Sequence, residues 1–242
     1  MKSVCIIQAR MGSSRLPGKI LMDISGKPML QHIVERVKRC GNVDEVIVAT
    51  SKNNEDKKVM ELCRRFNYKC FAGSEDDVLD RYYQAALKFG AGIIVSITGD
   101  CPLVDPIQID KIIDIQKKTK ADYVNNLELG LPLGIGAEAF TFAALKKSWE
   151  KGKLPHHREH VDDYILENPQ EFKTERFYPE EWMKKPYRLT VDTNEDLTLI
   201  RTIYGKLYRN GSIVELEEVY SLLEKEPELI RINKNIIQRK AK

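Results

Sequence analysis

The sequence has few cysteines, little charge imbalance and no long hydrophobic run. Its five cysteines, among 242 residues, form no CxxC pair, so neither a disulfide framework nor a cysteine-rich zinc site is indicated. The apolar run near residues 93–97 is far too short to cross a bilayer. The net charge of +3 is too small to indicate a nucleic-acid-binding surface. We therefore expect a reduced, cytoplasmic protein that binds neither nucleic acid nor membrane.

The first half of the chain alternates two kinds of segment. Short β-branched runs at residues 3–7 and 45–50 are each followed by an amphipathic stretch, at residues 29–40 and 54–66. This alternation is typical of βαβ units and predicts an α/β protein with a mainly parallel central sheet flanked by helices. Because no convincing linker interrupts the pattern, we expect one domain over residues 1–242.

Further elements are predicted in the second half. A buried strand at residues 92–97 lies between helices at 78–89 and 106–118, and a loop rich in glycine and proline follows at 130–136. Residues 188–191 read as another strand, and a helix starts behind it with Thr193 or Asn194 as its cap.

The segment QARMGSSRLPGK, residues 8–19, contains the densest chemical signal. It places Arg10, Arg15 and Lys19 beside two hydroxyls and two glycines, in a loop that follows the first strand. Open α/β sheets bind ligands at the carboxyl ends of their strands, so this loop predicts a phosphate site. The spacing fits neither a Walker loop nor the GxGxxG dinucleotide fingerprint.

Two carboxylates follow two of the predicted strands. Asp100 comes after the strand at 92–97, and Asp192 after the strand at 188–191. Each alone is also typical of a turn or a helix cap. Together, opposite a cationic loop, they predict a Mg²⁺ site, because this ion usually takes one or two carboxylates plus substrate phosphates. We expect Asp192→Asn to abolish turnover with little change in stability.

The loop motif resembles that of the sugar-acid cytidylyltransferases, which include the CMP-Kdo synthetases and acylneuraminate cytidylyltransferases. The resemblance continues in order along nearly the whole chain, and it is closest to the SpsF type named for spore-coat polysaccharide synthesis. The matching segments after the loop are GKPM at 26–29, VIVAT at 46–50, TGDCPLVDP at 98–106, REHV at 158–161 and VDTNEDL at 191–197. Gln8 stands where the Kdo enzymes usually have proline, which favours the SpsF branch.

The resemblance implies a nucleotide-diphospho-sugar transferase fold, transfer of CMP from CTP with release of pyrophosphate, Mg²⁺ dependence and a homodimer. It implies Arg15, Lys19, Asp100 and Asp192 as catalytic residues, the two aspartates also holding the metal. The implied nucleotide contacts are Gln8, Ala9, Arg10, Gly12, Ser13, Arg15, Lys19, Asp77, Arg81 and Asp100. Asp77 and Arg81 are equally typical of residues that cap or brace a helix.

The acceptor is expected to be an acidic sugar, such as a sialic-acid-like compound, activated for surface polysaccharide synthesis. We place it near Gly134, Glu138, Arg158, Glu159, His160 and Arg188, with residues 127–185 forming the substrate and dimerisation region. Two other enzyme classes stay open: a cytidylyltransferase that acts on a phosphorylated acceptor to give a CDP product, and a glycosyltransferase that uses a nucleotide sugar. A nucleotide-binding regulatory protein is a further alternative.

Overall fold

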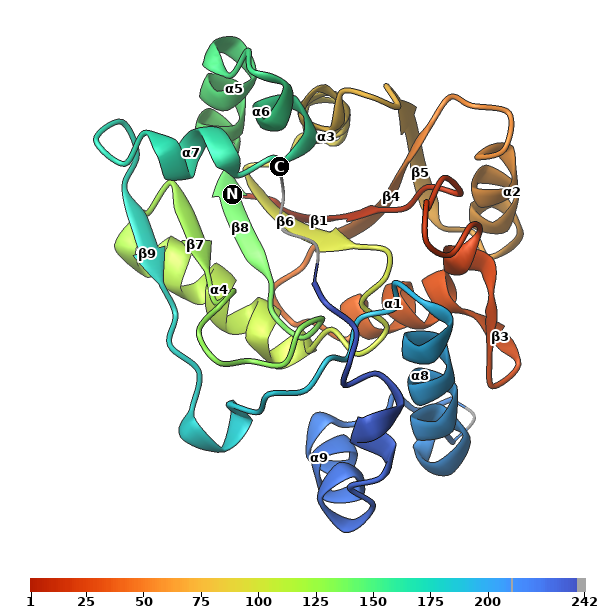
Figure 1. Ribbon diagram of the computed structural model, residues 1–242. Helices are drawn as coiled ribbons and strands as arrows, with labels where there is room; N and C mark the ends of the chain where they lie inside the picture. Colours follow the sequence, from red (N-terminus) through yellow and green to blue (C-terminus); the bar gives the residue numbers. More distant parts are fainter. Residues whose placement is uncertain (210, 239–242) are drawn as a thin grey trace.

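The computed structural model describes residues 1–209 and 211–238, and within them a seven-stranded sheet runs through the molecule (Figure 1). The strand order is β5-β4-β1-β6-β8-β7-β9. The strands are β1 (Ser3–Gln8), β4 (Glu45–Ser51), β5 (Lys69–Gly73), β6 (Ile93–Thr98), β7 (Tyr123–Asn125), β8 (Glu138–Thr141) and β9 (Thr174–Arg176), and the short β2 (Asp23–Ile24) and β3 (Lys27–Pro28) form a separate hairpin. Only β8 in the large sheet runs antiparallel to its neighbours. The predicted mainly parallel sheet is confirmed.

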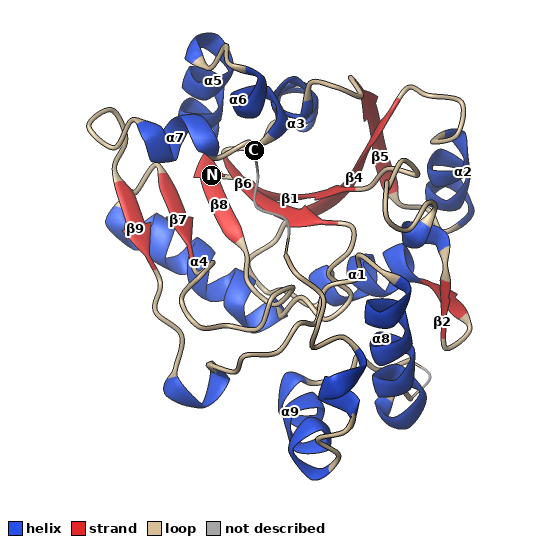
Figure 2. Ribbon diagram, in the orientation of Figure 1, coloured by secondary structure: helices blue, strands red, loops and turns tan. Residues whose placement is uncertain are grey.

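Helices cover both faces of the sheet (Figure 2). They are α1 (Met29–Val37), α2 (Lys57–Arg65), α3 (Val78–Phe89), α4 (Pro106–Thr119), α5 (Phe142–Lys151), α6 (Pro155–Glu159), α7 (Asp163–Glu167), α8 (Asn194–Leu207) and α9 (Leu216–Lys225). One face packs against α1, α2, α4, α8 and α9, and the other against α3, α5 and α7. No helix in the described part of the chain is long and apolar enough to span a membrane.

The central strand shows why both faces are covered. In β1, Cys5 and Ile7 belong to the core on the α1 face, whereas Val4 and Ile6 belong to the core on the α3 face. All four side chains are fully buried. Successive residues of a strand point to opposite faces, so an unbroken apolar run requires cover on both sides.

Most predicted elements are present with small shifts at their ends, and the helix at 78–89 coincides with α3. The strand predicted at 188–191 is wrong. This segment is an extended chain with one bridge, between Leu133 and Arg188. Its backbone instead bonds to two separate loops, because Leu189 N–H donates to Leu133 O and Val191 N–H donates to Asp100 O. The sequence pattern correctly indicated an extended backbone. Whether a neighbouring strand pairs with that backbone depends on tertiary contacts, which the pattern does not show.

A buried arginine of α1 binds the backbone of two loops that are distant in sequence. Arg36 is 2% exposed; its Nε donates to Val104 O at 2.7 Å and its Nη1 to Val214 O at 2.5 Å. Both carbonyls come from segments without regular hydrogen-bonding partners in a sheet or helix. The guanidinium therefore satisfies backbone groups that burial would otherwise leave unpaired.

We predict that Arg36→Met lowers the free energy of unfolding by about 2 to 4 kcal/mol, because it leaves two buried carbonyls without donors. Arg39→Met, in the turn directly after α1, is the control, since Arg39 is exposed and its side chain makes one hydrogen bond within the described residues, to Gly211 O. It should change stability by less than about 0.5 kcal/mol. Urea denaturation followed by circular dichroism measures both. Equal losses in the two variants would contradict the assigned role of Arg36.

Candidate active site

The phosphate loop predicted at residues 8–19 is a compact turn anchored at both ends. Leu16 and Ile20 are buried in the core, and Gly18 N–H donates to Met11 O at 2.9 Å. Gly18 has φ 71°, a left-handed conformation that glycine adopts without strain. These contacts fix the loop, so its cationic side chains are directed to one place rather than spread over the surface.

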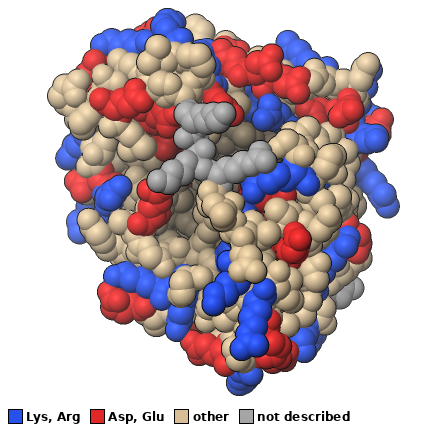
Figure 3. Space-filling view, in the orientation of Figure 1, with Lys and Arg blue, Asp and Glu red and all other residues tan. Residues whose placement is uncertain are grey.

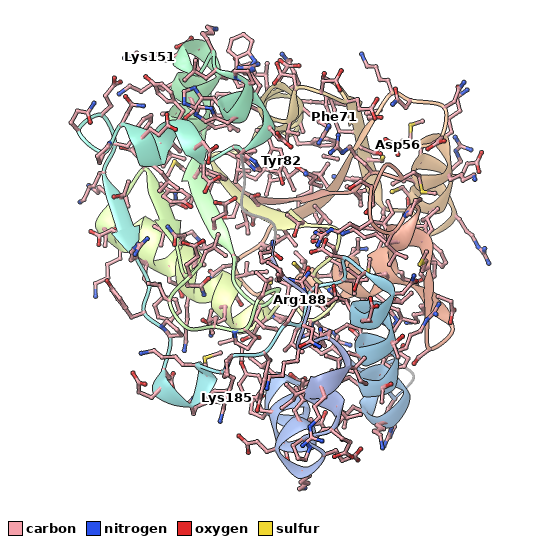
Figure 4. All side chains as sticks on the ribbon, viewed as in Figure 1. Asp56, Phe71, Tyr82, Lys151, Lys185 and Arg188 are labelled. Atoms are coloured by element: carbon pink, nitrogen blue, oxygen red, sulfur yellow. The ribbon has the colours of Figure 1, made fainter. Side chains whose placement is uncertain are left out.

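A buried carboxylate that the sequence did not reveal, Asp56, forms a hydrogen bond with this loop. Asp56 is 3% exposed, and its Oδ1 accepts from Met11 N–H at 2.7 Å while its Oδ2 accepts from the Ser51 hydroxyl at 2.5 Å. The label in Figure 4 marks Asp56 at the start of α2. No sequence signal pointed to it, because its partner Met11 is 45 residues away.

Lys19 lies at the centre of the site. Its Nζ donates to Asp100 Oδ2 at 2.8 Å, to Asp192 Oδ1 at 2.8 Å and to Val191 O at 2.7 Å. Burial alone would lower the pKa of Lys19, but the two aspartates outweigh it and raise the pKa above its usual value. Lys19 is therefore a permanent cation that brings together two carboxylates from distant parts of the chain.

Three cations surround Asp192. Besides Lys19, Arg15 Nη2 lies 3.0 Å and Arg188 Nη2 lies 2.7 Å from Asp192 Oδ2. Burial raises the pKa of Asp192, but Lys19, Arg15 and Arg188 together lower it below its usual value. Asp192 is 8% exposed and joins the loop to the chain before α8, so these ion pairs predict a contribution to stability that the sequence did not indicate.

Arg188 is held in turn by a second carboxylate. Its Nε donates to Asp196 Oδ1 at 2.9 Å, and Asn233 Nδ2 donates to the same oxygen at 2.8 Å. Asp196 is fully buried and forms the capping box of α8 with Thr193. Figure 4 shows Arg188 near the middle of the molecule, where β-sheet loops and α8 come together. The capping motif could have identified Asp196, but not its ion pair.

The loop, Asp100 and Asp192 line one cavity of about 290 Å³ at the carboxyl ends of β1 and β6. Its lining residues are Gln8, Arg10, Gly12, Ser13, Ser14, Arg15, Lys19, Ile20, Thr98, Gly99, Asp100 and Asp192. Figure 3 shows this side of the molecule hollowed near its centre, with side chains of both charge signs nearby. Of the predicted nucleotide contacts, Ala9, Asp77 and Arg81 do not line the cavity, whereas the lining residues Ser14, Ile20, Thr98 and Gly99 were not predicted.

Two glycines allow segments of the chain to approach each other closely at the cavity. A Cβ on Gly99 would lie 2.7 Å from Gln8 O, and Gly99 N–H donates to that oxygen at 2.7 Å. A Cβ on Gly134 (φ 98°) would lie 2.8 Å from Thr190 N. Gly134 thus packs behind the segment that carries Asp192, and any side chain there would push this segment away.

Asp77 and Arg81 stand beside the cavity as structural braces. Asp77 caps α3 by accepting from Asp80 N–H at 2.8 Å and receives Arg158 Nε at 2.8 Å. Arg81 is fully buried, and its Nη1 donates to Ser74 O at 2.5 Å. Burial, reinforced by nearby Arg10, lowers the pKa of Arg81. Arg81 Nε and Nη2 have no partner among the described residues, so nucleotide contact by Arg81 stays a prediction.

The predicted acceptor residues fall into two groups. Gly134 and Arg188 adjoin Asp192, whereas Glu138, Arg158, Glu159 and His160 belong to β8, α6 and the turn after α6. Glu138 Oε2 accepts from the Tyr123 hydroxyl at 2.8 Å. Burial, reinforced by Asp162, raises the pKa of Glu138 well above its usual value. Acceptor binding by either group stays a prediction.

The two aspartates have the chemistry of a magnesium site. Oxygen ligands are what Mg²⁺ takes in proteins, and the carboxylates of Asp100 and Asp192 converge on a single point. That point is filled by the Lys19 ammonium, which gives each carboxylate a positive partner. The two carboxylates thus fit a divalent cation. The ion would take the place of the Lys19 ammonium, which would turn toward another anion.

Comparisons with known proteins show the family of the chain. The sequence model of the cytidylyltransferases matches residues 4–230. The chain belongs to the cytidylyltransferase family. A solved cytidylyltransferase from Leptospira borgpetersenii is similar over 99% of this chain and 100% of that one, with a TM-score of 0.88 and 31% identity. The expected fold is therefore confirmed, as is the family to which the loop motif pointed.

The relatives of this chain in other organisms carry several names. An uncharacterized protein of Methanocaldococcus jannaschii is 39% identical and covers 99% of this chain and 97% of its own. The spore coat polysaccharide biosynthesis protein SpsF of Bacillus subtilis is 33% identical over 92% of this chain and 94% of its own. The 3-deoxy-manno-octulosonate cytidylyltransferase of Geobacter metallireducens is 43% identical, over 47% of this chain and 44% of its own.

We predict a specific pH dependence for the ion pairs of Asp192. Because its pKa is lowered in the folded protein, the stabilisation is present above the pKa of unfolded aspartate, about 3.9, and is lost as the pH falls through the lower folded value. Asp192→Asn should lower the free energy of unfolding at pH 7 by about 1 to 3 kcal/mol. Thermal unfolding measured from pH 7 to pH 2 should show this deficit shrinking only below about pH 4.

Asp76→Asn is the control for this series, because Asp76 is an exposed carboxylate outside the cavity lining. It should unfold like the wild-type protein at every pH. A deficit in Asp192→Asn that disappears already near pH 6, or that persists unchanged at pH 2, would contradict the assigned ion pairs.

Proposed function

We propose that the protein transfers CMP from CTP to the hydroxyl of an acidic sugar and releases pyrophosphate, as a step in surface polysaccharide synthesis. The observation that carries the proposal is the cavity in which Arg10, Arg15 and Lys19 face Asp100 and Asp192. Family membership supports cytidylyl transfer as the reaction class. The names of SpsF and of the Geobacter enzyme support polysaccharide synthesis and a sugar acid as acceptor.

Lys19 and Arg15 are suited to bind the triphosphate because each is already fixed in the cavity. Without nucleotide, Asp192 holds both side chains in place through its two oxygens. When phosphates enter, the cations can exchange a carboxylate for a phosphate oxygen with little reorganisation. Cations positioned in advance in this way stabilise the charge that develops on the phosphate oxygens during transfer.

The charges of the site also favour binding of a metal ion together with the nucleotide. Arg10, Arg15, Lys19 and Arg188 are offset by Asp100, Asp192 and Asp196, so the site is nearly neutral before it binds nucleotide. A triphosphate adds several negative charges, which the side chains alone do not balance. We propose that Asp100 and Asp192 hold Mg²⁺, which would neutralise part of this charge and activate the acceptor hydroxyl.

The acceptor is proposed to enter between the two groups of candidate residues described above. Arg188 is the cation best placed to receive its carboxylate, because it lies 2.7 Å from Asp192 and is only partly exposed. Asp196 and Asn233 fix its orientation. Its Nε and Nη2 are bound to Asp196, so the acceptor carboxylate would bind Nη1 in place of the Gln238 side chain, which is exposed.

The direct test incubates the protein with CTP, Mg²⁺ and a panel of sugar acids and follows pyrophosphate release. The expected result is release that requires a sugar acid and scales with its concentration. Release only with phosphorylated acceptors would replace the proposal with a CDP-forming reaction. Tight CTP binding without release for any acceptor would support a regulatory protein instead.

We predict that Lys19→Ala lowers kcat/KM by about 100- to 1000-fold, since it removes a fixed cation from the transferring phosphate. Lys57→Ala on α2 is the matched control, because Lys57 is exposed and is not among the residues that line the cavity, and it should retain full activity. Pyrophosphate release measures activity, and circular dichroism checks that both variants are folded. A folded Lys19→Ala protein with normal turnover would remove Lys19 from the proposed mechanism.

A further inference from the structure

Outside the cavity, two neighbouring histidines share one carboxylate. His156 Nε2 lies 2.8 Å from Glu167 Oε1, and His157 Nε2 lies 2.7 Å from Glu167 Oε2. The histidines belong to α6 and the glutamate to α7, so the cluster joins two short helices. A set of one ligand atom from each of the three residues lies within 4.8 Å of one another.

The separations suit a small divalent ion. Zinc binds imidazole nitrogen and carboxylate oxygen at about 2.0 to 2.2 Å, so tetrahedral ligand atoms lie about 3.4 Å apart. The two nitrogen–oxygen pairs of the cluster are slightly closer than this, and they would separate by less than about 1 Å to admit the ion. The present hydrogen bonds therefore hold the three side chains in nearly the required arrangement.

The surroundings of His157 fix the orientation of its ring. This residue is 5% exposed, its ring packs edge-on against Tyr164 at 5.3 Å, and its Nδ1 has no partner in the described part of the structure. Burial and this ring contact hold His157 with Nε2 directed at Glu167.

The other side of the cluster is open to solvent. The Glu167 side chain is 49% exposed and that of His156 is 29% exposed. Three protein ligands with one solvent-accessible position are the ligand set of many zinc sites that keep a bound water. Two imidazoles and one carboxylate also select zinc over magnesium, which prefers oxygen ligands throughout.

We propose that His156, His157 and Glu167 form a zinc site that fixes α6 to α7. Arg158, which follows His157 in α6, holds Asp77 at the start of α3 through two contacts, of 2.8 and 2.5 Å. A zinc ion at the cluster would thus stabilise the wall formed by α3, α6 and α7. It is separate from the cavity around Lys19, whose lining includes none of the three ligands.

The test uses the full chain after treatment with a chelator. Zn²⁺ is titrated by isothermal calorimetry with a reductant present, and thermal unfolding is followed with Zn²⁺ or Mg²⁺. The proposal predicts one zinc ion per chain, and a higher melting temperature with zinc but not with magnesium. His156→Ala and Glu167→Gln should each weaken zinc affinity by at least about 10-fold. Both substitutions alter partly exposed side chains, so the variants should fold.

Two controls separate this cluster from other zinc-binding groups. Glu150→Gln alters an exposed glutamate of α5, and Cys70→Ser removes a thiol that lines the same surface pocket as Cys63. Neither should change zinc affinity. The proposal is overturned if the wild-type protein binds no zinc, or if His156→Ala and Glu167→Gln bind it as tightly as wild type.

Discussion

The ammonium of Lys19 determines how the site is assembled. It touches Asp100 after β6 and Asp192 before α8, two carboxylates separated by 92 positions in sequence (192 − 100). Without a cation between them, like charges held this closely in a cavity would repel each other. The same contact requires the loop that carries Lys19 to be rigid, which explains the buried anchors Leu16 and Ile20 and the support from Asp56.

The topology of the sheet accounts for most of this arrangement. Parallel strands end at the same edge of the sheet, so β1 and β6 bring the phosphate loop and Asp100 together without any further device. Asp192 reaches them by a different route, through backbone bonds to the Asp100 segment and the loop around Leu133. The family match extends over residues 4–230 and thus includes every residue that lines the cavity.

The sequence predicted the local features well and the long-range ones poorly. The phosphate loop, α3 and the capped start of α8 are local patterns of periodicity and capping, and each is present. The side of the sheet formed by β8, β7 and β9 was not predicted, because these strands are short. The role of Asp56 was missed because its partner Met11 is distant in sequence. The ion pairs of Asp192 also depend on tertiary packing, so spacing indicated its place but not its contribution to stability.

The most direct measurement is a crystal structure of the protein with Mg²⁺ and a CTP analogue that cannot be cleaved at the α-phosphate. The account predicts the triphosphate in the Lys19 cavity, with Lys19 and Arg15 bound to phosphate oxygens and a metal ion on Asp100 and Asp192. A nucleotide bound elsewhere, with Lys19 still between the two aspartates, would contradict it.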